Sequence, residues 1–469
     1  MNTVDKLKNS FLVKKSDAFL HRRFSGNTMD YKRIFSMYLP LLFDQTFLIW
    51  LSFLNLSMIS SSGDAAVAAV DMVDSINIFF VGALIAIASG GTVVIAQYKG
   101  SKDTVQIPKA VGATVFAVLF LGAAVSAVLL IFHMPILSFL FGAAEPAVME
   151  NAQVYMVGAT LSFCGISITS AASGALRGIG ETRSSLLISV LQNGLYVILN
   201  YVFITRMNMG ILGMCLSLNI CRYTAAFVAI ILLLKSKSNL FSNVRDLFKI
   251  NFKLIKRILI FGLPFAYEQL FFNGGKILTQ TFIVGMGEAA QVINAVCLRL
   301  NSIGTIAQSS LSLLSITVVG QCLGNKDIPQ AKKMVKSTLG AVFLISVVTT
   351  FGLYLIFNPL VGSLTTNKEI VPEILKILMM SQIGQVFTWG ASWLLPAVLR
   401  TGGDARYTSF VSLLSMWLFR VGAGYIFGVT LGLGIMGVWM ATIVDWIIRG
   451  TFFSLRYRSN KWYLHKVID

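Results

Sequence analysis

Hydrophobic positions in this chain gather in long, almost uninterrupted runs rather than in the short alternating patterns of a water-soluble protein. Residues 110–132 and 337–357 form two such runs, and others recur along the whole sequence between short polar gaps. A helix of about 20 apolar residues crosses the hydrocarbon core of a bilayer. The pattern therefore predicts an all-α integral membrane protein with twelve transmembrane helices.

The distribution of charge orients these helices. The chain has 469 residues, of which 56% are hydrophobic and 12% charged, far less charge than a soluble surface of this size needs. The net charge of +18 could indicate a nucleic-acid partner, but 30 of the 38 Lys and Arg residues lie in every second gap: 1–33, 99–109, 177–183, 235–257, 326–336, 400–406 and 456–466. The positive-inside rule then places both termini and all these gaps in the cytoplasm, so we expect no nucleic-acid partner.

The second half of the chain repeats the first. A shift of 224 residues aligns Pro40 with Pro264, and Asp44 with Glu268. The same shift aligns the tetrapeptide "GDAA" with "GEAA" and the heptapeptide "QYKGSKD" with "QCLGNKD"; "LRGIGETR" meets "LRTGGDAR" one residue out of register. Because each half crosses the membrane six times, an even number, both halves begin on the same side of the membrane and the two repeats are parallel. We expect two six-helix lobes related by a pseudo-two-fold axis near the membrane normal.

The predicted lobes divide the chain. Their order is a cytoplasmic N-terminal segment, the N-terminal lobe, an interlobe linker, the C-terminal lobe and a cytoplasmic tail, at residues 1–33, 34–234, 235–257, 258–455 and 456–469. The basic linker could instead, or also, anchor to lipid headgroups.

Several classes of site find no support in the sequence. The five Cys residues stand singly in or beside apolar runs and there are only three His residues, so we expect neither a metal site nor a disulfide framework. No Walker-type loop is present, and no nucleophile–base cluster indicates an enzyme. The motifs "QYKGSKD" and "LRGIGETR" are interpreted as structural loops, in which Gly ends a helix and Asp caps the next.

The doubled motifs resemble those of the multidrug and toxic compound extrusion (MATE) family, in a branch common in Gram-positive bacteria. The resemblance extends from Tyr31 to Trp462 and rests on these residues: Gln97, Gly100, Asp103, Arg177, Gly178, Gly180, Gly210 and Gly213, with their partners Gln321, Gly324, Asp327, Arg400, Gly402, Gly403, Gly434 and Gly437. It implies a multi-pass transporter of the bacterial cell membrane that exports organic compounds in exchange for protons or sodium.

One departure from that resemblance concerns the coupling ion. A prokaryotic branch of the family carries an aspartate fifteen residues after the first-helix proline, where this chain has Asn55. The helix-5 positions that carry Asn and Asp in that branch are Tyr196 and Asn200 here. Because a sodium site needs several oxygen ligands around a carboxylate, we expect protons rather than sodium, carried by other acids.

Asp44 and Glu268 are the first candidates for cation coupling. Each lies four residues after a proline, Pro40 or Pro264, that can kink its helix. A carboxyl group within a bilayer is costly and usually lines a cavity or a proton pathway. The repeat should place both acids near the central axis. The alternative is that each only hydrogen-bonds a neighbouring helix.

Three further charged candidates lie in predicted helices. Asp71 and Asp74 share one helix face and could form a proton-binding dyad, or lie hydrated near the extracellular mouth. Lys276 could pair with an acid from another helix. Asp445 and Arg449, four residues apart, are interpreted as an intrahelical ion pair.

Neutral polar residues could orient a substrate or simply join helices. These candidates are Gln45, Gln269, Asn273, Asn55 and Asn200. The sequence thus predicts a monomeric secondary transporter, without cofactor, that exports cationic or amphipathic organic compounds by alternating access. A flippase for lipid-linked saccharides, or a metabolite exporter of the same superfamily, is the alternative.

Overall fold

The computed structural model describes residues 11–59, 63–142, 144–236, 251–362, 364–365 and 367–468, and this part of the chain contains helices and no strand. The helices of the first half are α2 (Phe11–Phe24), α3 (Tyr31–Ile59), α4 (Asp64–Gly100), α5 (Gln106–Phe141), α6 (Pro146–Leu161), α7 (Phe163–Ile179), α8 (Thr182–Asn200), η2 (Tyr201–Arg206) and α9 (Gly210–Leu234). Most of the predicted linker, residues 237–250, lies outside the described residues.

The second half follows the same order. Its helices are α11 (Phe252–Gly285), α12 (Glu288–Gly304), α13 (Ile306–Gly324), α14 (Ile328–Leu355), α15 (Phe357–Gly362), α16 (Val371–Trp389), η3 (Gly390–Leu394), α17 (Leu395–Thr401), α18 (Ala405–Ser415), η4 (Met416–Gly422), α19 (Ala423–Tyr425), η5 (Ile426–Thr430), α20 (Gly434–Arg458) and η6 (Lys461–Tyr463). Segments labelled η2 to η5 are π-helical stretches that continue a longer helix.

Eight helices in the described part of the chain are long and apolar enough to cross a membrane, or nine when α6 and α7, bent by 42°, count as one span. The other three predicted spans are α3, α11 and the segment α16–α17. These carry Asp44, Glu268 and Lys276, and Arg400 respectively. Within the described residues, the three predicted spans that are not apolar enough to be recognised by hydropathy are therefore the ones that carry these charged side chains.

The internal repeat is visible in the backbone. Positive φ angles recur at equivalent positions of the two halves: Gly63 and Gly287, Lys102 and Lys326, Gly180 and Gly403, and Gly210 and Gly434. Asp103 and Asp327 each accept hydrogen bonds from backbone N–H groups at the start of the next helix, as the loop interpretation expects. The two halves therefore share loop geometry as well as helix order.

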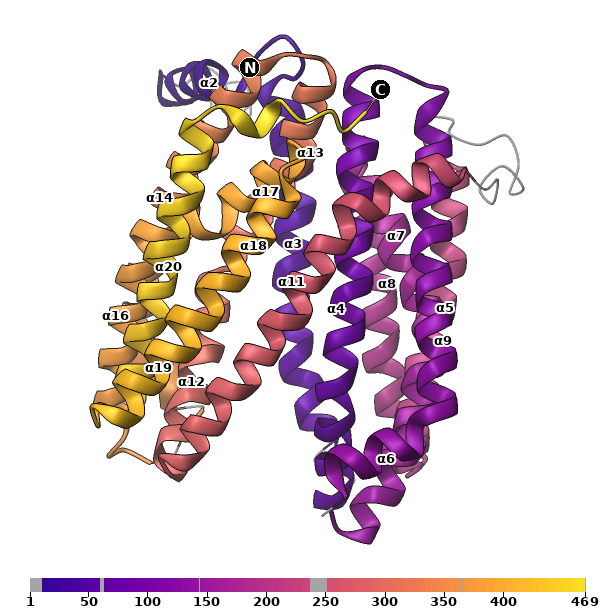
Figure 1. The fold of residues 1–469 in the computed structure, drawn as a ribbon, viewed down its shortest axis with the longest axis vertical. Helices are drawn as coiled ribbons and strands as arrows, with labels where there is room; N and C mark the ends of the chain where they lie inside the picture. The colour runs from indigo at the N-terminus through magenta and orange to yellow at the C-terminus, as the bar shows by residue number, and fades with distance from the viewer. Residues whose placement is uncertain are drawn as a thin grey trace, which may run out of the picture.

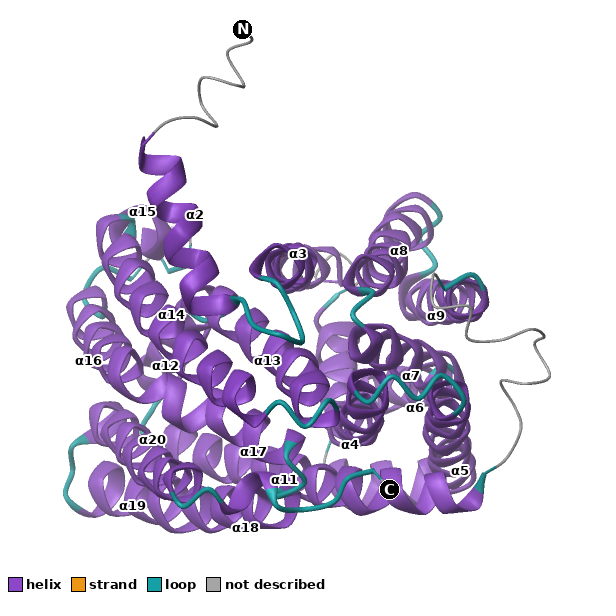
Figure 2. Cartoon of the chain, turned by 90° about the horizontal axis from the view of Figure 1, so that it is seen from above, coloured by secondary structure: helices purple, strands orange, loops and turns teal. Residues whose placement is uncertain are grey.

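Helices of the two halves form two bodies that are close together at one end and apart at the other (Figure 1). The end where they meet carries α2 and the C-terminal tail (residues 459–468), and is called the terminal end below. Figure 2 looks onto this end and shows α13 and α4 near the middle of the molecule, with α3 at its upper edge and α11 along its lower edge.

The first helix of each half packs into the opposite lobe at the terminal end. Ile34, Met37 and Leu41 of α3 are buried in one hydrophobic cluster with α13, α14 and α17 of the second half. Leu254 and Ile258 of α11 are buried with α4, α5 and α7 of the first half. The packing of α3 against the second half and of α11 against the first half joins the two lobes at the terminal end, and the sequence repeat alone does not reveal it.

The C-terminal tail also connects the lobes. Trp462 is fully buried in the second-half cluster, while Val467, five residues later, is buried in the first-half cluster. The Trp462 ring stacks on Tyr457 with centroids 5.5 Å apart. The tail therefore lies across the junction of the two lobes.

Trp462→Ala should lower the free energy of unfolding by about 3–5 kcal/mol, because it removes a fully buried indole and leaves a cavity. Unfolding of the purified protein by a denaturing detergent gives this value. Leu464→Ala in the same tail, where the side chain is 70% exposed, is the control and should change stability by less than about 0.5 kcal/mol. Equal effects of the two substitutions would contradict this account of the tail.

Candidate functional site

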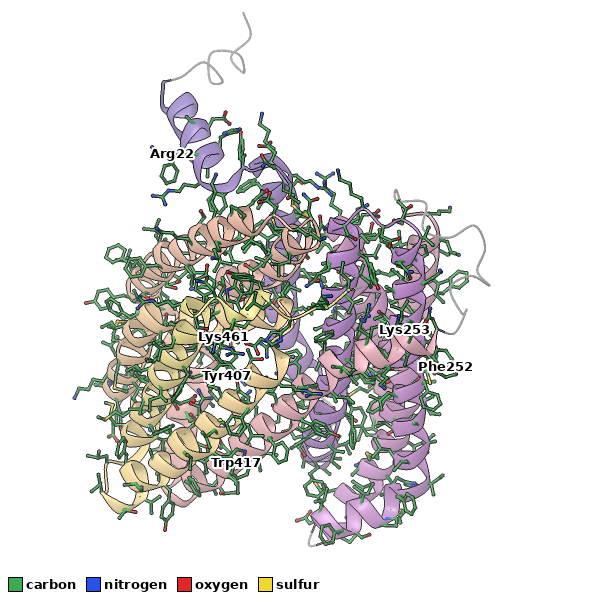
Figure 3. The ribbon with its side chains drawn as sticks, turned by 45° about the horizontal axis from the view of Figure 1, so that its top comes forward. Arg22, Phe252, Lys253, Tyr407, Trp417 and Lys461 are labelled. Carbon is green, nitrogen blue, oxygen red and sulfur yellow. The ribbon has the colours of Figure 1, made fainter. Side chains whose placement is uncertain are left out.

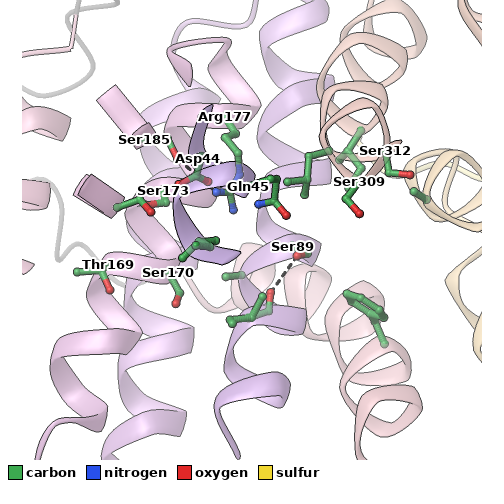
Figure 4. A pocket seen from close by; sticks show the side chains of 18 of the residues that line it. Asp44, Gln45, Ser89, Thr169, Ser170, Ser173, Arg177, Ser185, Ser309 and Ser312 are labelled. Atoms are coloured by element: carbon green, nitrogen blue, oxygen red, sulfur yellow. Dashed lines mark hydrogen bonds between the residues drawn. The ribbon is translucent and has the colours of Figure 1, made fainter. Parts of the chain in front are cut away.

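A cavity of about 570 Å³ lies between the two lobes. Figure 4 shows its polar side chains, which come from α3, α4, α7, α8 and α13. Its polar and aromatic lining includes Asp44, Gln45, Ser89, Thr169, Ser170, Ser173, Arg177, Ser185, Ser189, Gln192, Asn193, Phe261, Phe265, Ser309, Ser312, Trp389, Trp393 and Arg400. Both repeats therefore contribute to one shared space.

Asp44 lies in the wall of this cavity beside Arg177 (Figure 4). It is 6% exposed, and its Oδ1 atom has no hydrogen-bond partner. Arg177 Nη1 donates a hydrogen bond to Ser185 Oγ at 3.3 Å. A buried carboxyl with an unused oxygen next to a guanidinium is positioned to gain or lose a proton as the arginine moves.

Glu268 repeats this arrangement in the second half. Arg400 Nη1 donates to Glu268 Oε2 at 2.9 Å, and Ser409 Oγ donates to the same oxygen at 3.0 Å. Arg400 also lies over the Phe265 ring, 4.2 Å from its centroid. Arg400 lines the same cavity as Asp44, so the ion pair of Glu268 and Arg400 borders that cavity too.

The structure adds Arg177 and Arg400 to the predicted site residues. They belong to the motifs "LRGIGETR" and "LRTGGDAR", whose pattern predicts structural loops. Arg177 lies in the last turn of α7 and Arg400 in the last turn of α17, and both residues line the cavity. The feature of the sequence that points to a functional role is that an arginine recurs at the equivalent position of each repeat.

Arg400→Gln should lower the free energy of unfolding by about 3 kcal/mol, because it leaves the buried Glu268 carboxylate without its counter-charge. Adding Glu268→Gln to that variant should recover much of the loss. Denaturant unfolding of the two single variants and the double variant measures the coupling. Strictly additive effects would show that the two side chains do not interact.

The neutral candidates lie at different places. Gln45 lines the cavity, and Gln269 and Asn273 face Gly82 of α4. Asn200 is buried, and its Oδ1 atom has no hydrogen-bond partner.

The remaining candidates lie in α3 and α11. Asn55 lies in the part of α3 whose side chains are outside the described residues. Pro40 and Pro264 both lie inside continuous helices, α3 and α11.

Asp71 and Asp74 have different surroundings. Asp71 is exposed, whereas the Asp74 carboxylate accepts hydrogen bonds from Asn77 Nδ2 and Tyr155 Oη, both at 3.1 Å. The Asp74 group is therefore fixed by polar neighbours within the N-terminal lobe. Their proposed proton dyad stays a prediction.

The predicted intrahelical pair of Asp445 and Arg449 is wrong. Asp445 Oδ2 lies 3.1 Å from Arg420 Nη2 on η4, and Asp445 Oδ1 accepts a hydrogen bond from Ser415. Arg420 lies in the π-helical segment η4, so the partner of Asp445 comes from another helix and not from the next turn of α20. Lys276 has no carboxylate partner among the described residues.

The cavity is closed on the side of the terminal end by contacts that the repeat duplicates. Gln97 Nε2 donates to the Thr401 carbonyl at 2.8 Å, and Gln321 Nε2 donates to the Gly178 carbonyl at 2.9 Å. Gly100 and Gly324 meet across the same junction. A Cβ atom at Gly324 would lie 1.9 Å from the Gln97 carbonyl oxygen, and one at Gly100 would lie 2.0 Å from that of Gln321. These glycines therefore permit a backbone contact that no other residue allows.

Two repeated helical lobes that enclose a cavity with both polar and apolar lining, and that close over it at one end, define a multi-pass membrane transport protein. The MatE family profile matches residues 40–202 and again residues 264–426. The chain therefore belongs to the multidrug and toxic compound extrusion family, whose members are transporters and not enzymes. This finding confirms the predicted two-lobed membrane fold.

Known relatives resemble the chain over most of its length. It is 25% identical over 437 residues to an uncharacterized transporter, YisQ, of Bacillus subtilis (strain 168), covering 92% of this chain and 94% of that protein. It is 25% identical over 386 residues to a probable multidrug resistance protein, NorM, of Thermotoga maritima, covering 81% of this chain and 82% of the relative. A crystal structure of a MATE protein in complex with MaL6 superposes with a TM-score of 0.82 at 19% identity, covering 91% of this chain and 96% of the other.

Proposed function

We propose that this protein is a secondary active exporter of amphipathic organic compounds, coupled to protons and working by alternating access as a monomer in a bacterial plasma membrane. The relative named a probable multidrug resistance protein supports efflux. The single observation that carries the coupling is Asp44, a buried carboxyl with an unpartnered oxygen in the wall of the shared cavity.

The basic segments support an orientation with both termini in the cytoplasm. Arg22, Lys253 and Lys461, which belong to these segments, lie nearer the terminal end than Trp417 does (Figure 3). In this orientation the contacts of Gln97 and Gln321 close the cytoplasmic side. The described conformation is then outward-facing, with the cavity separated from the cytoplasm.

Proton exchange at Asp44 would link that closure to the membrane gradient. A proton entering from outside neutralises the carboxylate and weakens its attraction for Arg177, and release to the cytoplasm restores it. Arg177 is followed directly by Gly178, whose carbonyl accepts the hydrogen bond from Gln321. A change in the charge of Asp44 therefore affects an arginine next to the closed junction. A potential of 100 mV supplies about 2.3 kcal/mol for each charge moved.

The surroundings of Asp44 favour a proton over sodium. A sodium site needs several oxygen ligands around a carboxylate, whereas a guanidinium lies beside this one.

The charges around the cavity also bear on the substrate. Asp44 has Arg177 beside it and Glu268 is paired with Arg400, so neither carboxylate leaves a surplus negative charge for a cationic compound. Apolar and aromatic side chains such as Phe265, Trp389 and Trp393 form much of the remaining wall. We therefore propose amphipathic compounds rather than obligatory cations.

The test is substrate-triggered proton release from energised inside-out membrane vesicles containing the protein, measured by dequenching of a pH-sensitive dye. The expected result is release on adding an amphipathic compound in the absence of sodium, and a much smaller release with Asp44→Asn, which removes the carboxyl group proposed to carry the proton. Release that requires sodium would assign coupling to that ion. Accumulation of the compound without any proton movement would refute proton exchange.

A further inference from the structure

Three basic side chains surround one aromatic ring in the second lobe. Lys276 Nζ lies 5.0 Å from the centroid of the Phe272 ring, Arg420 Cζ lies 5.3 Å from it, and Arg449 Cζ lies 6.0 Å from it. They come from three different elements, α11, η4 and α20, which together place three basic side chains around one ring. We call these three side chains and Phe272 the basic cluster.

Negative charge at the basic cluster does not balance the positive charge. Asp445 is paired with Arg420 at 3.1 Å. Glu268, the nearest acid along α11, is paired with Arg400. In the described part of the chain, Lys276 and Arg449 have no carboxylate partner. The positive charges of the buried Arg449 and the exposed Lys276 are therefore not paired with a carboxylate.

Arg449 is the member of the basic cluster with the most unsatisfied buried hydrogen-bond donors. It is 2% exposed, and its Nε and Nη2 atoms have no hydrogen-bond partner. Burying a cation without a partner is strongly unfavourable, and a ligand that supplies the missing acceptors recovers that cost. The planar guanidinium matches the two oxygens of an oxyanion.

The basic cluster adjoins the central cavity through Trp393. The Arg449 guanidinium lies 4.6 Å from the centroid of a Trp393 ring, and the Phe272 and Trp393 rings meet edge to face with centroids 6.0 Å apart. Trp393 itself lines the cavity. Lys276 is exposed and provides the accessible side of the cluster. A compound in the cavity thus meets an aromatic wall with cations directly behind it.

We propose that the basic cluster binds the oxyanion of an amphipathic substrate, a carboxylate, sulfonate or phosphate, while the apolar body of the compound packs on Trp393 and Phe272. This assignment rests on the proposed export function and names the chemical class of its substrates. Arg449 and Lys276 hold the oxyanion, and Arg420 stays paired with Asp445.

The binding test uses the purified full-length protein without any ion gradient, so that its result is independent of proton coupling. The probes are radiolabelled 1-naphthylacetate and its uncharged analogue 1-naphthylacetamide, which differ only in the charged group. Scintillation-proximity binding should show at least tenfold tighter binding of the acid by the unmodified protein. Equal affinities for acid and amide would overturn the proposal.

Two variants and one control locate the binding. Arg449→Gln should weaken binding of the acid about tenfold or more and leave that of the amide unchanged, because a charged hydrogen bond is lost. Lys276→Gln alters an exposed side chain, does not threaten folding, and should weaken acid binding several-fold. Arg458→Gln, which removes an exposed arginine at the end of the same helix as Arg449, should have no effect. An equal loss in all three variants would contradict the assignment.

A lipid headgroup presents the same oxyanion chemistry, so its contribution is measured separately. The binding is repeated in nanodiscs of phosphatidylcholine alone and with one third phosphatidylglycerol. Unchanged affinity for naphthylacetate supports a substrate oxyanion. Displacement of the probe by phosphatidylglycerol, relieved by Arg449→Gln, would assign the cluster to an anionic lipid and overturn the proposal.

Discussion

Asp44→Asn should reduce substrate-triggered proton release at least tenfold while leaving the folded protein intact. Asparagine keeps the shape and polarity of the side chain but neither binds nor releases a proton. It also removes the charge beside Arg177 in the wall of the cavity (Figure 4). The measurement is dye dequenching in inside-out vesicles, with equal amounts of protein verified in the membrane.

Glu150→Gln provides the matched control for that experiment, because Glu150 is exposed on α6 and lies outside the cavity lining. It should retain the full proton signal. If Asp44→Asn also retained it, the coupling would lie with another acid. Glu268 and the hydrogen-bonded Asp74 would then be the next groups to test.

Gly324→Ala should prevent closure of the terminal end and nearly abolish transport. The added methyl group would lie 1.9 Å from the Gln97 carbonyl oxygen, a distance at which backbone must move. Overpacking of this kind typically costs about 1–3 kcal/mol, and here it acts only on the closed state. A cost of about 3 kcal/mol would reduce the ratio of closed to open molecules by roughly a hundredfold.

The state of the terminal end can be measured directly. Spin labels on cysteines substituted at Lys109 and Lys336, exposed residues near the starts of α5 and α14, report the separation of the lobes by double electron–electron resonance. Gly324→Ala should shift the distribution to longer distances. Gly340→Ala, in a helix position with no atom within 4 Å of the new methyl group, should leave both distance and transport unchanged. Identical distributions for the two variants would refute the closure mechanism.

Much of the fold was predictable because the bilayer imposes a strong pattern on the sequence. Long apolar runs, alternate basic gaps and a 224-residue repeat were sufficient for the two-lobed helical fold. The exchange of α3 and α11 into the opposite lobes was not predictable, since an apolar face does not specify which lobe it packs against.

The site was predicted in part. Asp44 is a candidate because a carboxyl group in an apolar run is conspicuous; it lines the cavity, and its role in cation coupling stays a prediction. Arg177 and Arg400 were missed because basic residues near a helix end are ordinarily explained by the cytoplasmic interface. The pairing of Asp445 with Arg420 depends on the π-helical turn of η4, which spacing along α20 does not reveal.

The central claim is that a proton gradient alone drives transport through this protein. The most direct measurement uses purified protein in liposomes, with either an imposed pH gradient or an imposed sodium gradient, and follows uptake of a labelled amphipathic compound. The account predicts uptake with the pH gradient, none with sodium alone, and loss of the pH-driven uptake with Asp44→Asn. Uptake driven by sodium, or equal uptake by the Asp44→Asn protein, would contradict it.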